Sequence, residues 1–177
     1  MDSGNHEAFK GLRQCVLDVS PDKMKMDYKQ LPATWSRIII DGDPGAGKTT
    51  LAKEIARECG AKVISFDEYL RGNCENYLQQ LNYEKLQKDI LDCPEKAVME
   101  GVCALMVLAK IEVRYDFHIF MKRFNGFIGW DFGHYLNPKV KLPRSKLDAE
   151  VVGYYRKHKP FHICDCEMSR DVLESLT

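Results

Sequence analysis

Residues 42–49 read GDPGAGKT, which fits the phosphate-binding pattern G-x-x-x-x-G-K-[ST]. The apolar, β-branched run RIIID at 37–41 precedes this stretch and indicates a buried strand. The sequence TTLAKEIAREC at 49–59 follows it and carries its apolar residues on one face of a helix. A glycine-rich turn and a helix N-terminus both offer free backbone N–H groups to an anion. This context predicts a P-loop and makes a chance match improbable.

Each side chain of the loop has an expected role in holding a nucleoside triphosphate. Lys48 is expected to reach the β- and γ-phosphates, and the Thr49 hydroxyl is expected to ligate Mg²⁺. The sequence contains no N-K-x-D motif for guanine, so ATP is favoured over GTP. The predicted nucleotide-binding residues are Gly42, Asp43, Pro44, Gly45, Ala46, Gly47, Lys48, Thr49 and Thr50.

Strand-like and helix-like segments alternate after the loop. The expected strands are 37–41, 62–66, 97–100 and 116–121, and the expected helices are 51–59, 83–93, 103–109 and 145–159. Gly60 is expected to end the first helix, and Ser145 with Asp148 forms a capping box at the start of the last one. Alternating strands and helices predict an α/β fold with a parallel sheet flanked by helices, which with the loop indicates a P-loop NTPase.

The segment before residue 37 has an apolar spacing of its own. Apolar side chains recur there at helical intervals, namely Phe9, Leu12, Val16 and Val19. The spacing predicts an amphipathic helix from about His6 to Val19. We therefore expect a helical extension over 1–36, followed by the P-loop domain over 37–177.

Composition narrows the class of protein. The 177 residues carry no net charge, which argues against a dedicated nucleic-acid binder, and they include no apolar run long enough to cross a membrane. The seven cysteines are an odd number, and no signal-peptide pattern precedes them, so a reducing, cytoplasmic setting is expected. Residues 121–160 hold nine Lys or Arg and three Asp or Glu, which suits a polyanionic ligand or a solvated basic face.

Two carboxylates follow predicted strands at the edge of the sheet where α/β proteins place their sites. Asp67 comes after the strand at 62–66, and Glu100 ends the strand at 97–100. A kinase needs one acid to hold Mg²⁺ and one to orient or deprotonate the acceptor hydroxyl. Both acids are therefore candidates for metal and substrate binding, and Asp67 for catalysis. The alternative for each acid is a helix N-cap or a solvated loop residue, and for Asp67 the capped helix would be a short one at 68–71.

A family resemblance rests on the succession IIIDGDPGAGKTTLAKEIA, VISFDEYL, NYEKLQKDIL, AVMEG and YDFHIFMKR. Over roughly residues 37 to 123 it resembles the uridine kinase and phosphoribulokinase family of P-loop kinases. The resemblance implies a fold of the nucleoside/nucleotide-kinase type, a nucleoside-like acceptor and Asp67 as catalytic base. It also matches Glu100 to a family Glu that precedes a glycine, and Tyr69 to an aromatic residue that borders the acceptor. EVVGYYRKHKPF is similar to a region near the family's C-terminal strand.

The segment at about 122–146 departs from the arginine-rich lid helix of that family. It is lid-like because three glycines and two prolines interrupt it, and we expect it to be mobile and to close over the ligands. Arg123 is expected to replace the lid arginines as a catalytic residue, with Arg144 as the second choice; Lys139, Lys141 and Lys146 are further basic candidates. Its aromatic residues are expected to stack on the acceptor, to form a lid or partner surface, or to pack ordinarily; they are Phe124, Phe127, Trp130, Phe132 and Tyr135.

The sequence favours an ATP- and Mg²⁺-dependent kinase that transfers the γ-phosphoryl group to the hydroxyl of a small, nucleoside-like acceptor. The alternative is a regulatory or toxin-type P-loop protein that acts on a macromolecular partner, and a third is a degenerate kinase that only binds nucleotide. Neither the acceptor nor the oligomeric state follows from the sequence, and a homo-oligomer stays open.

Overall fold

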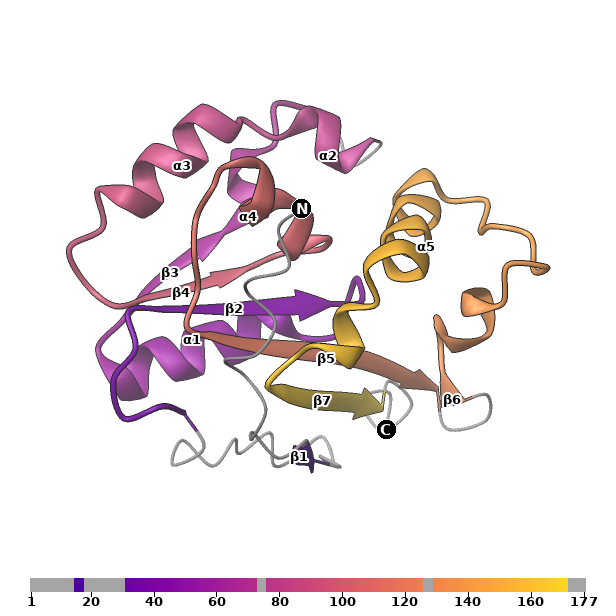
Figure 1. Ribbon diagram of the computed structural model, residues 1–177, viewed down its shortest axis with the longest axis horizontal. Helices are drawn as coiled ribbons and strands as arrows, with labels where there is room; N and C mark the ends of the chain where they lie inside the picture. The colour runs from indigo at the N-terminus through magenta and orange to yellow at the C-terminus, as the bar shows by residue number, and fades with distance from the viewer. Residues whose placement is uncertain (1–14, 18–30, 73–75, 126–128, 172–177) are drawn as a thin grey trace, which may run out of the picture.

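The computed structural model describes residues 15–17, 31–72, 76–125 and 129–171, which form a seven-stranded sheet. The strand order is β1-β7-β5-β2-β4-β3, with β6 paired to β5 (Figure 1). All pairs are parallel except β5–β6. The strands are β1 (Cys15–Leu17), β2 (Arg37–Gly42), β3 (Lys62–Ser65), β4 (Ala97–Glu100), β5 (Phe117–Asn125), β6 (Gly129–Trp130) and β7 (Cys166–Asp171).

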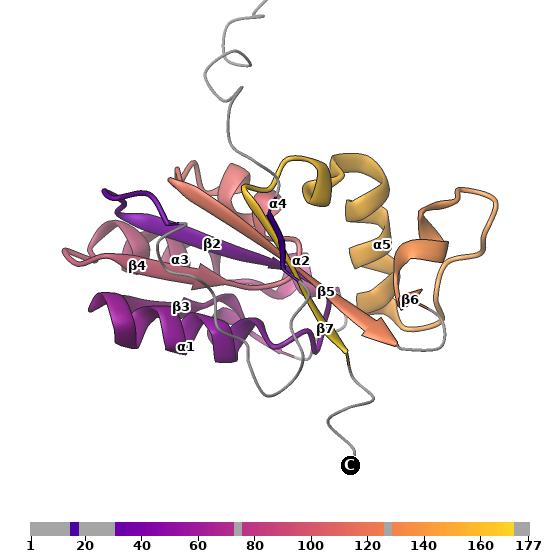
Figure 2. The same cartoon turned by 90° about the horizontal axis from the view of Figure 1, so that it is seen from below.

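Helices cover both faces of this sheet. The α-helices are α1 (Lys48–Cys59), α2 (Tyr77–Gln80), α3 (Tyr83–Leu91), α4 (Ala104–Lys110) and α5 (Lys146–His158), and the short 3₁₀ helices are η3 (Phe66–Tyr69), η4 (Gly133–Leu136) and η5 (Pro160–His162). Figure 2 shows α1 on one face, with α4 and α5 on the other. Among the described residues, no helix has both the length and the apolar character that crossing a bilayer requires.

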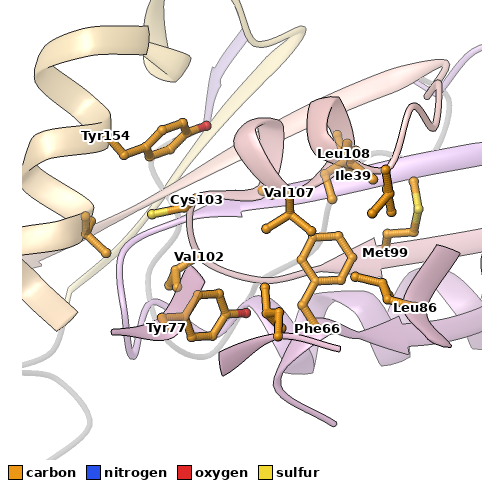
Figure 3. Close-up of a cluster of buried hydrophobic side chains, with 14 of the residues drawn as sticks. Ile39, Phe66, Tyr77, Leu86, Met99, Val102, Cys103, Val107, Leu108 and Tyr154 are labelled. Carbon is orange, nitrogen blue, oxygen red and sulfur yellow. The ribbon is translucent and has the colours of Figure 1, made fainter. Parts of the chain in front are cut away.

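Successive side chains of the central strands point to opposite faces of the sheet, so each face has its own hydrophobic core. Ile38 and Ile40 of β2 belong to a buried cluster with the apolar stripe of α1, whereas Ile39 belongs to a second cluster with α3, α4 and α5. In Figure 3, Phe66 of η3 lies within this second cluster, near Leu86. Strands covered on both faces are apolar throughout, which explains the short, continuous apolar runs of the sequence.

The predicted strands and helices after residue 36 are found, with small shifts at their ends. Gly60 ends α1 in the left-handed conformation, and the Ser145 hydroxyl accepts the Asp148 N–H at the start of α5. The short helix near Asp67 is η3, whose N-cap is Ser65, so the prediction of Asp67 as an N-cap is wrong.

The strand β5 is longer than predicted, and this changes the lid. It continues to Asn125 and pairs with both β6 and β7, so Lys122 and Arg123 belong to the sheet. The start of the lid-like segment at 122 is therefore wrong, because backbone pairing on both sides of β5 continues past the apolar run. Gly126 and Phe127 lie outside the described residues.

The N-terminal helix prediction is wrong where the structure describes it. Cys15–Leu17 is a strand that pairs in parallel with β7 at the edge of the sheet. An edge strand offers unpaired backbone groups, and pairing with them outweighs a weak helical spacing. The rest of the predicted helix lies outside the described residues, and the division of the chain at residue 36 stays a prediction.

Candidate nucleotide and acceptor site

The loop between β2 and α1 has the backbone that a phosphate cradle needs. Gly45 and Gly47 have φ values of +74° and +88°, in the left-handed region that favours glycine. Gly42 has φ +135°, and a Cβ there would lie 2.1 Å from the Met121 carbonyl oxygen of β5. The first glycine is thus required for close approach of two strands, and the others for the turn itself.

The Lys48 side chain lies along the loop. Its Nζ donates to the carbonyl oxygens of Gly42, at 3.2 Å, and Asp43, at 2.8 Å, and the residue is 7% exposed. Burial lowers the pKa of this amine, while the carboxylates of Glu100 and Asp41 oppose the shift. The cation is therefore held at the place where a loop-bound phosphate would need it.

Thr49 and Glu100 meet on the other side of the loop. The Thr49 hydroxyl donates to Glu100 Oε1 at 3.0 Å. In the pairing of β2 with the adjacent strand β4, Ile40 lies opposite Glu100. This register places the Glu100 carboxylate beside the first turn of α1. A hydroxyl and a carboxylate are the hard oxygen ligands that Mg²⁺ prefers, with substrate phosphates and waters as the rest. These two residues fit the predicted metal.

A cavity of about 380 Å³ lies over the loop. It is lined by Pro44, Gly45, Gly47, Lys48, Thr49, Thr50, Asp67, Tyr77, Glu100, Val102 and Leu147. Predicted nucleotide, metal and acceptor residues thus share one hollow at the carboxyl ends of the strands. Gly42, Asp43 and Ala46 of the loop are buried and lie outside this lining.

Asp67 reaches the cavity from η3, which directly follows β3, the strand beyond β4. Its side chain is exposed, and its Oδ1 accepts the hydroxyl of Tyr77 at 2.9 Å. Burial, and next the nearby Asp67 charge, raise the pKa of Tyr77, so this phenol stays a donor. Since parallel strands lie about 4.8 Å apart, Asp67 stands roughly two strand spacings from β2. This spacing leaves room for a ligand between the loop and the carboxylate.

Tyr69 does not lie where the resemblance implied. Its hydroxyl donates to Asp89 Oδ2 of α3 at 2.9 Å, and the residue is not part of the cavity lining. The aromatic residue that borders Asp67 in the structure is Tyr77, from α2. The position was matched by its distance from Asp67 along the chain, but the 3₁₀ turn of η3 directs Tyr69 toward α3.

Arg123 lies against the loop and outside the cavity lining. Its Nε donates to Asp131 at 2.6 Å, and its Nη1 donates to the Pro44 carbonyl oxygen at 2.9 Å. The predicted second choice, Arg144, is exposed and also lies outside the lining. A catalytic role for Arg123 stays a prediction.

Two aromatic residues of the lid-like segment pack into the domain. Phe132 is 3% exposed, and Trp130 contacts Phe120 and Phe161 edge to face, with ring centroids 6.3 and 5.2 Å apart. Of the three expected roles for the aromatic residues, these two therefore have ordinary packing. The remainder of the segment leads to α5, whose first turn places Leu147 in the cavity wall. The mobility of the segment stays a prediction.

Sequence reasoning missed the two tyrosines that hold the acids flanking Gly42. The hydroxyl of Tyr154 donates to Asp41, and that of Tyr155 donates to Asp43 Oδ1 at 2.7 Å. Burial raises the pKa of Asp41 to about 6, against the hydrogen bonds that it accepts. A doublet of tyrosines on the buried face of the last helix, together with the pattern D-G-D in the loop, was the available signal.

Parts of this chain are similar to ATPases of known families. The ATPase family associated with various cellular activities (AAA) matches residues 38–91. The A-like 1 form of the katanin p60 ATPase-containing subunit from Homo sapiens is 41% identical over 59 residues, which are 33% of this chain and 12% of that protein. Cell division control protein 48 homolog B from Arabidopsis thaliana is 25% identical over 108 residues, 58% of this chain and 18% of that protein. The matches thus span less than a fifth of these relatives.

Two solved structures of kinases align with most of this chain. A possible uridine kinase from Bacillus stearothermophilus aligns with 78% of this chain and 90% of its own, at 21% identity and a TM-score of 0.48. Shikimate kinase from Aquifex aeolicus aligns with 75% of this chain and 86% of its own, at 15% identity and a TM-score of 0.47. The chain itself has a phosphate-binding loop between the central strand β2 and α1, in a mostly parallel sheet flanked by helices. This is a P-loop NTPase fold, and the predicted fold class is confirmed.

Proposed function

We propose that this chain is an ATP-dependent kinase that transfers the γ-phosphoryl group to a hydroxyl of a small acceptor. The observation that carries the proposal is the cavity, which has the phosphate-binding loop on one side and Asp67 on the other. A carboxylate that is held by a tyrosine across the cavity from the loop can orient and deprotonate the nucleophile of phosphoryl transfer. An acceptor hydroxyl gives that carboxylate a function.

The chemistry uses residues of both sides. Lys48 leaves the carbonyls of Gly42 and Asp43 and binds the β- and γ-phosphate oxygens, where it stabilises the charge that develops during transfer. Thr49 and Glu100 would hold Mg²⁺, which would neutralise part of the negative charge of the phosphates.

Asp67 orients the acceptor hydroxyl and takes its proton. The acceptor oxygen then bonds to the γ-phosphorus, the bond from that phosphorus to the β,γ-bridging oxygen breaks, and ADP leaves. Tyr77 keeps Asp67 in place through its hydroxyl. Val102 and Leu147 add an apolar wall against which a ring can pack. A nucleoside-like acceptor accords with this wall and with the family resemblance of the sequence.

The proposal is tested by acceptor-dependent release of ADP. The purified chain is incubated with ATP and Mg²⁺, alone and with each member of a panel of nucleosides and sugars, and phosphorylated products are identified by mass spectrometry. We expect ADP and a phosphorylated acceptor in equal amounts with at least one nucleoside. ADP release that no acceptor accelerates would contradict the kinase proposal.

The second candidate is an ATPase that acts on a macromolecular partner. The 41% identity of a 59-residue stretch to a katanin-like ATPase favours it. The same assay separates the two functions, because an ATPase of this kind transfers the γ-phosphoryl group to water and releases ADP and inorganic phosphate without a small-molecule acceptor. Tight binding of ATP without any turnover would indicate instead a module that only binds nucleotide.

A further inference from the structure

The carboxylate of Asp43 is buried inside the phosphate-binding loop and accepts three hydrogen bonds. The backbone N–H of Arg123 and the indole Nε1–H of Trp130 donate to Oδ2, each at 2.7 Å. The Tyr155 hydroxyl donates to Oδ1, also at 2.7 Å. The donors come from β5, β6 and α5, so one loop side chain contacts three separate elements.

The carboxylate and its tyrosine donor lie in a buried, largely aromatic setting. Asp43 and Tyr155 are fully buried, and the rings of Trp130 and Tyr155 pack with centroids 6.0 Å apart. Phe120 and Phe161 surround the same two rings. Water cannot readily replace a donor that is removed here, so each donor matters more than it would on the surface.

The backbone of Asp43 also takes part in the nucleotide site. Its carbonyl oxygen accepts Lys48 Nζ at 2.8 Å, and its N–H donates to the Met121 carbonyl oxygen at 2.9 Å. The next two positions are Pro44 and Gly45, which line the cavity. Any displacement of Asp43 would therefore move both the lysine and the loop that receives the phosphates.

We propose that Asp43 anchors the phosphate-binding loop from behind, and that Trp130 and Tyr155 are positioning residues for nucleotide binding. A loop with glycines at positive φ has many accessible conformations, and an anchored loop avoids the entropy cost of ordering them when ATP binds. The proposal rests on nucleotide binding by the loop, which the kinase and its ATPase alternative share. It does not depend on the acceptor.

The same helix offers a matched control. Tyr154 is nearly as buried as Tyr155 and also donates to a carboxylate, but that carboxylate is Asp41, which lies in β2 directly before the loop. Tyr154→Phe and Tyr155→Phe each remove one buried hydroxyl. If the hydroxyls only stabilise the fold, the two variants should lose melting temperature and nucleotide affinity in the same proportion.

The first experiment measures affinity for a non-hydrolysable ATP analogue with Mg²⁺ by titration calorimetry. We expect Tyr155→Phe and Trp130→Phe to weaken binding about tenfold, and Tyr154→Phe to stay within about twofold of the parent even where its melting temperature falls. Asp43→Ala should weaken binding further, and Asp43→Asn, which keeps one acceptor oxygen, should restore part of the loss. Equal affinity losses in the two tyrosine variants would overturn the proposal.

The fluorescence of Trp130 provides a second readout, which should not respond to nucleotide if Trp130 has a purely structural role. The chain has two tryptophans, and Trp35 precedes β2 at the end of the sheet opposite the loop. In a Trp35→Phe background, Trp130 emission should shift when the analogue binds, because its indole N–H shares a carboxylate with the loop. The shift should disappear in Asp43→Ala, or in Tyr155→Phe if Asp43→Ala does not fold. Unaltered Trp130 emission on saturation with the analogue would overturn the proposal.

Discussion

The two sides of the cavity are built in different ways. The loop side is one continuous stretch, residues 42–50, whose conformation follows from its glycines and from the strand and helix that flank it. The opposite side consists of single residues from separate segments, namely Asp67, Tyr77, Val102 and Leu147. Phosphate recognition is thus local in the sequence, whereas recognition of an acceptor depends on how distant segments fold together.

The two sides also differ in how they are held. Asp43 fixes the loop from inside the protein through Tyr155, and Tyr154 holds Asp41 in the strand β2 that leads to the loop. On the opposite side, Asp67 is exposed and has the hydroxyl of Tyr77 as a hydrogen-bond donor. A loop that is anchored by buried hydrogen bonds suits a constant ligand such as a triphosphate. An exposed carboxylate with a single tyrosine support can exchange partners when an acceptor enters.

The largest effect on transfer is expected on the acceptor side. Asp67→Asn keeps the shape of the side chain but cannot take the acceptor's proton, so transfer should fall about 100- to 10,000-fold. Affinity for ATP should stay within a few-fold of the parent, because Asp67 does not contact the loop. Turnover with the best acceptor and calorimetric titration with ATP and Mg²⁺ measure the two quantities separately.

The neighbouring Glu68 is exposed and lies outside the cavity lining, so Glu68→Gln is the matched control and should behave as the parent. Loss of ATP binding in Asp67→Asn, with transfer otherwise preserved, would assign Asp67 to the metal and reverse the roles of the two acids.

The loop side should respond with a different signature. Lys48→Ala removes the cation that follows the transferring phosphate, which costs about 2–4 kcal/mol in the transition state, or roughly 30- to 1000-fold in rate. Unlike Asp67→Asn, it should also weaken ATP binding, because the same cation contacts the ground-state phosphates. Lys53→Ala, on the exposed face of α1, is the control. A folded Lys48→Ala protein with the parent's rate would contradict the P-loop assignment.

The same contrast explains what the sequence could predict. The loop, the strands that flank it and the positions of Glu100 and Asp67 follow from short patterns, because a buried parallel strand and its succeeding turn are local features. The neighbour of Asp67 did not follow, since Tyr77 is ten residues away and reaches it only through the turn at η3 and α2. Leu147 and the two tyrosines reach the site because α5 packs against the sheet, and no local pattern predicts that packing.

The N-terminal segment shows most clearly that a local sequence pattern does not determine tertiary pairing. Its helical spacing is real, but pairing of Cys15–Leu17 with the sheet depends on an edge strand about 150 residues further along the chain. Likewise, Arg123 was expected in a lid, but it lies in β5, which pairs with both β6 and β7. Tertiary pairing decided both cases against a local preference.

The smallest effect concerns pH and lies beneath the loop, at Asp41 and His118. Burial raises the pKa of Asp41 to about 6 and lowers that of His118 to about 3, and the two side chains are 4.0 Å apart. Between about pH 4 and 6 the folded state keeps a proton on Asp41 that the unfolded state has lost, so this group stabilises the fold at low pH. That contribution disappears as the pH rises through 6. His118 acts in the opposite sense, because between about pH 3 and 6.5 only the unfolded state binds its proton.

The two contributions nearly cancel between pH 4 and 6 in the parent. In Asp41→Asn only the histidine contribution is left, so the stability of the variant relative to the parent should rise by about 1.4 kcal/mol per pH unit over that range. In His118→Leu the relative stability should instead fall with pH at a similar slope. Urea unfolding from pH 4 to 7 measures both differences, and other carboxylates drop out because parent and variant share them. Parallel stability curves for Asp41→Asn and the parent would show that Asp41 does not hold a proton in this range and that β2 carries an ionised carboxylate there.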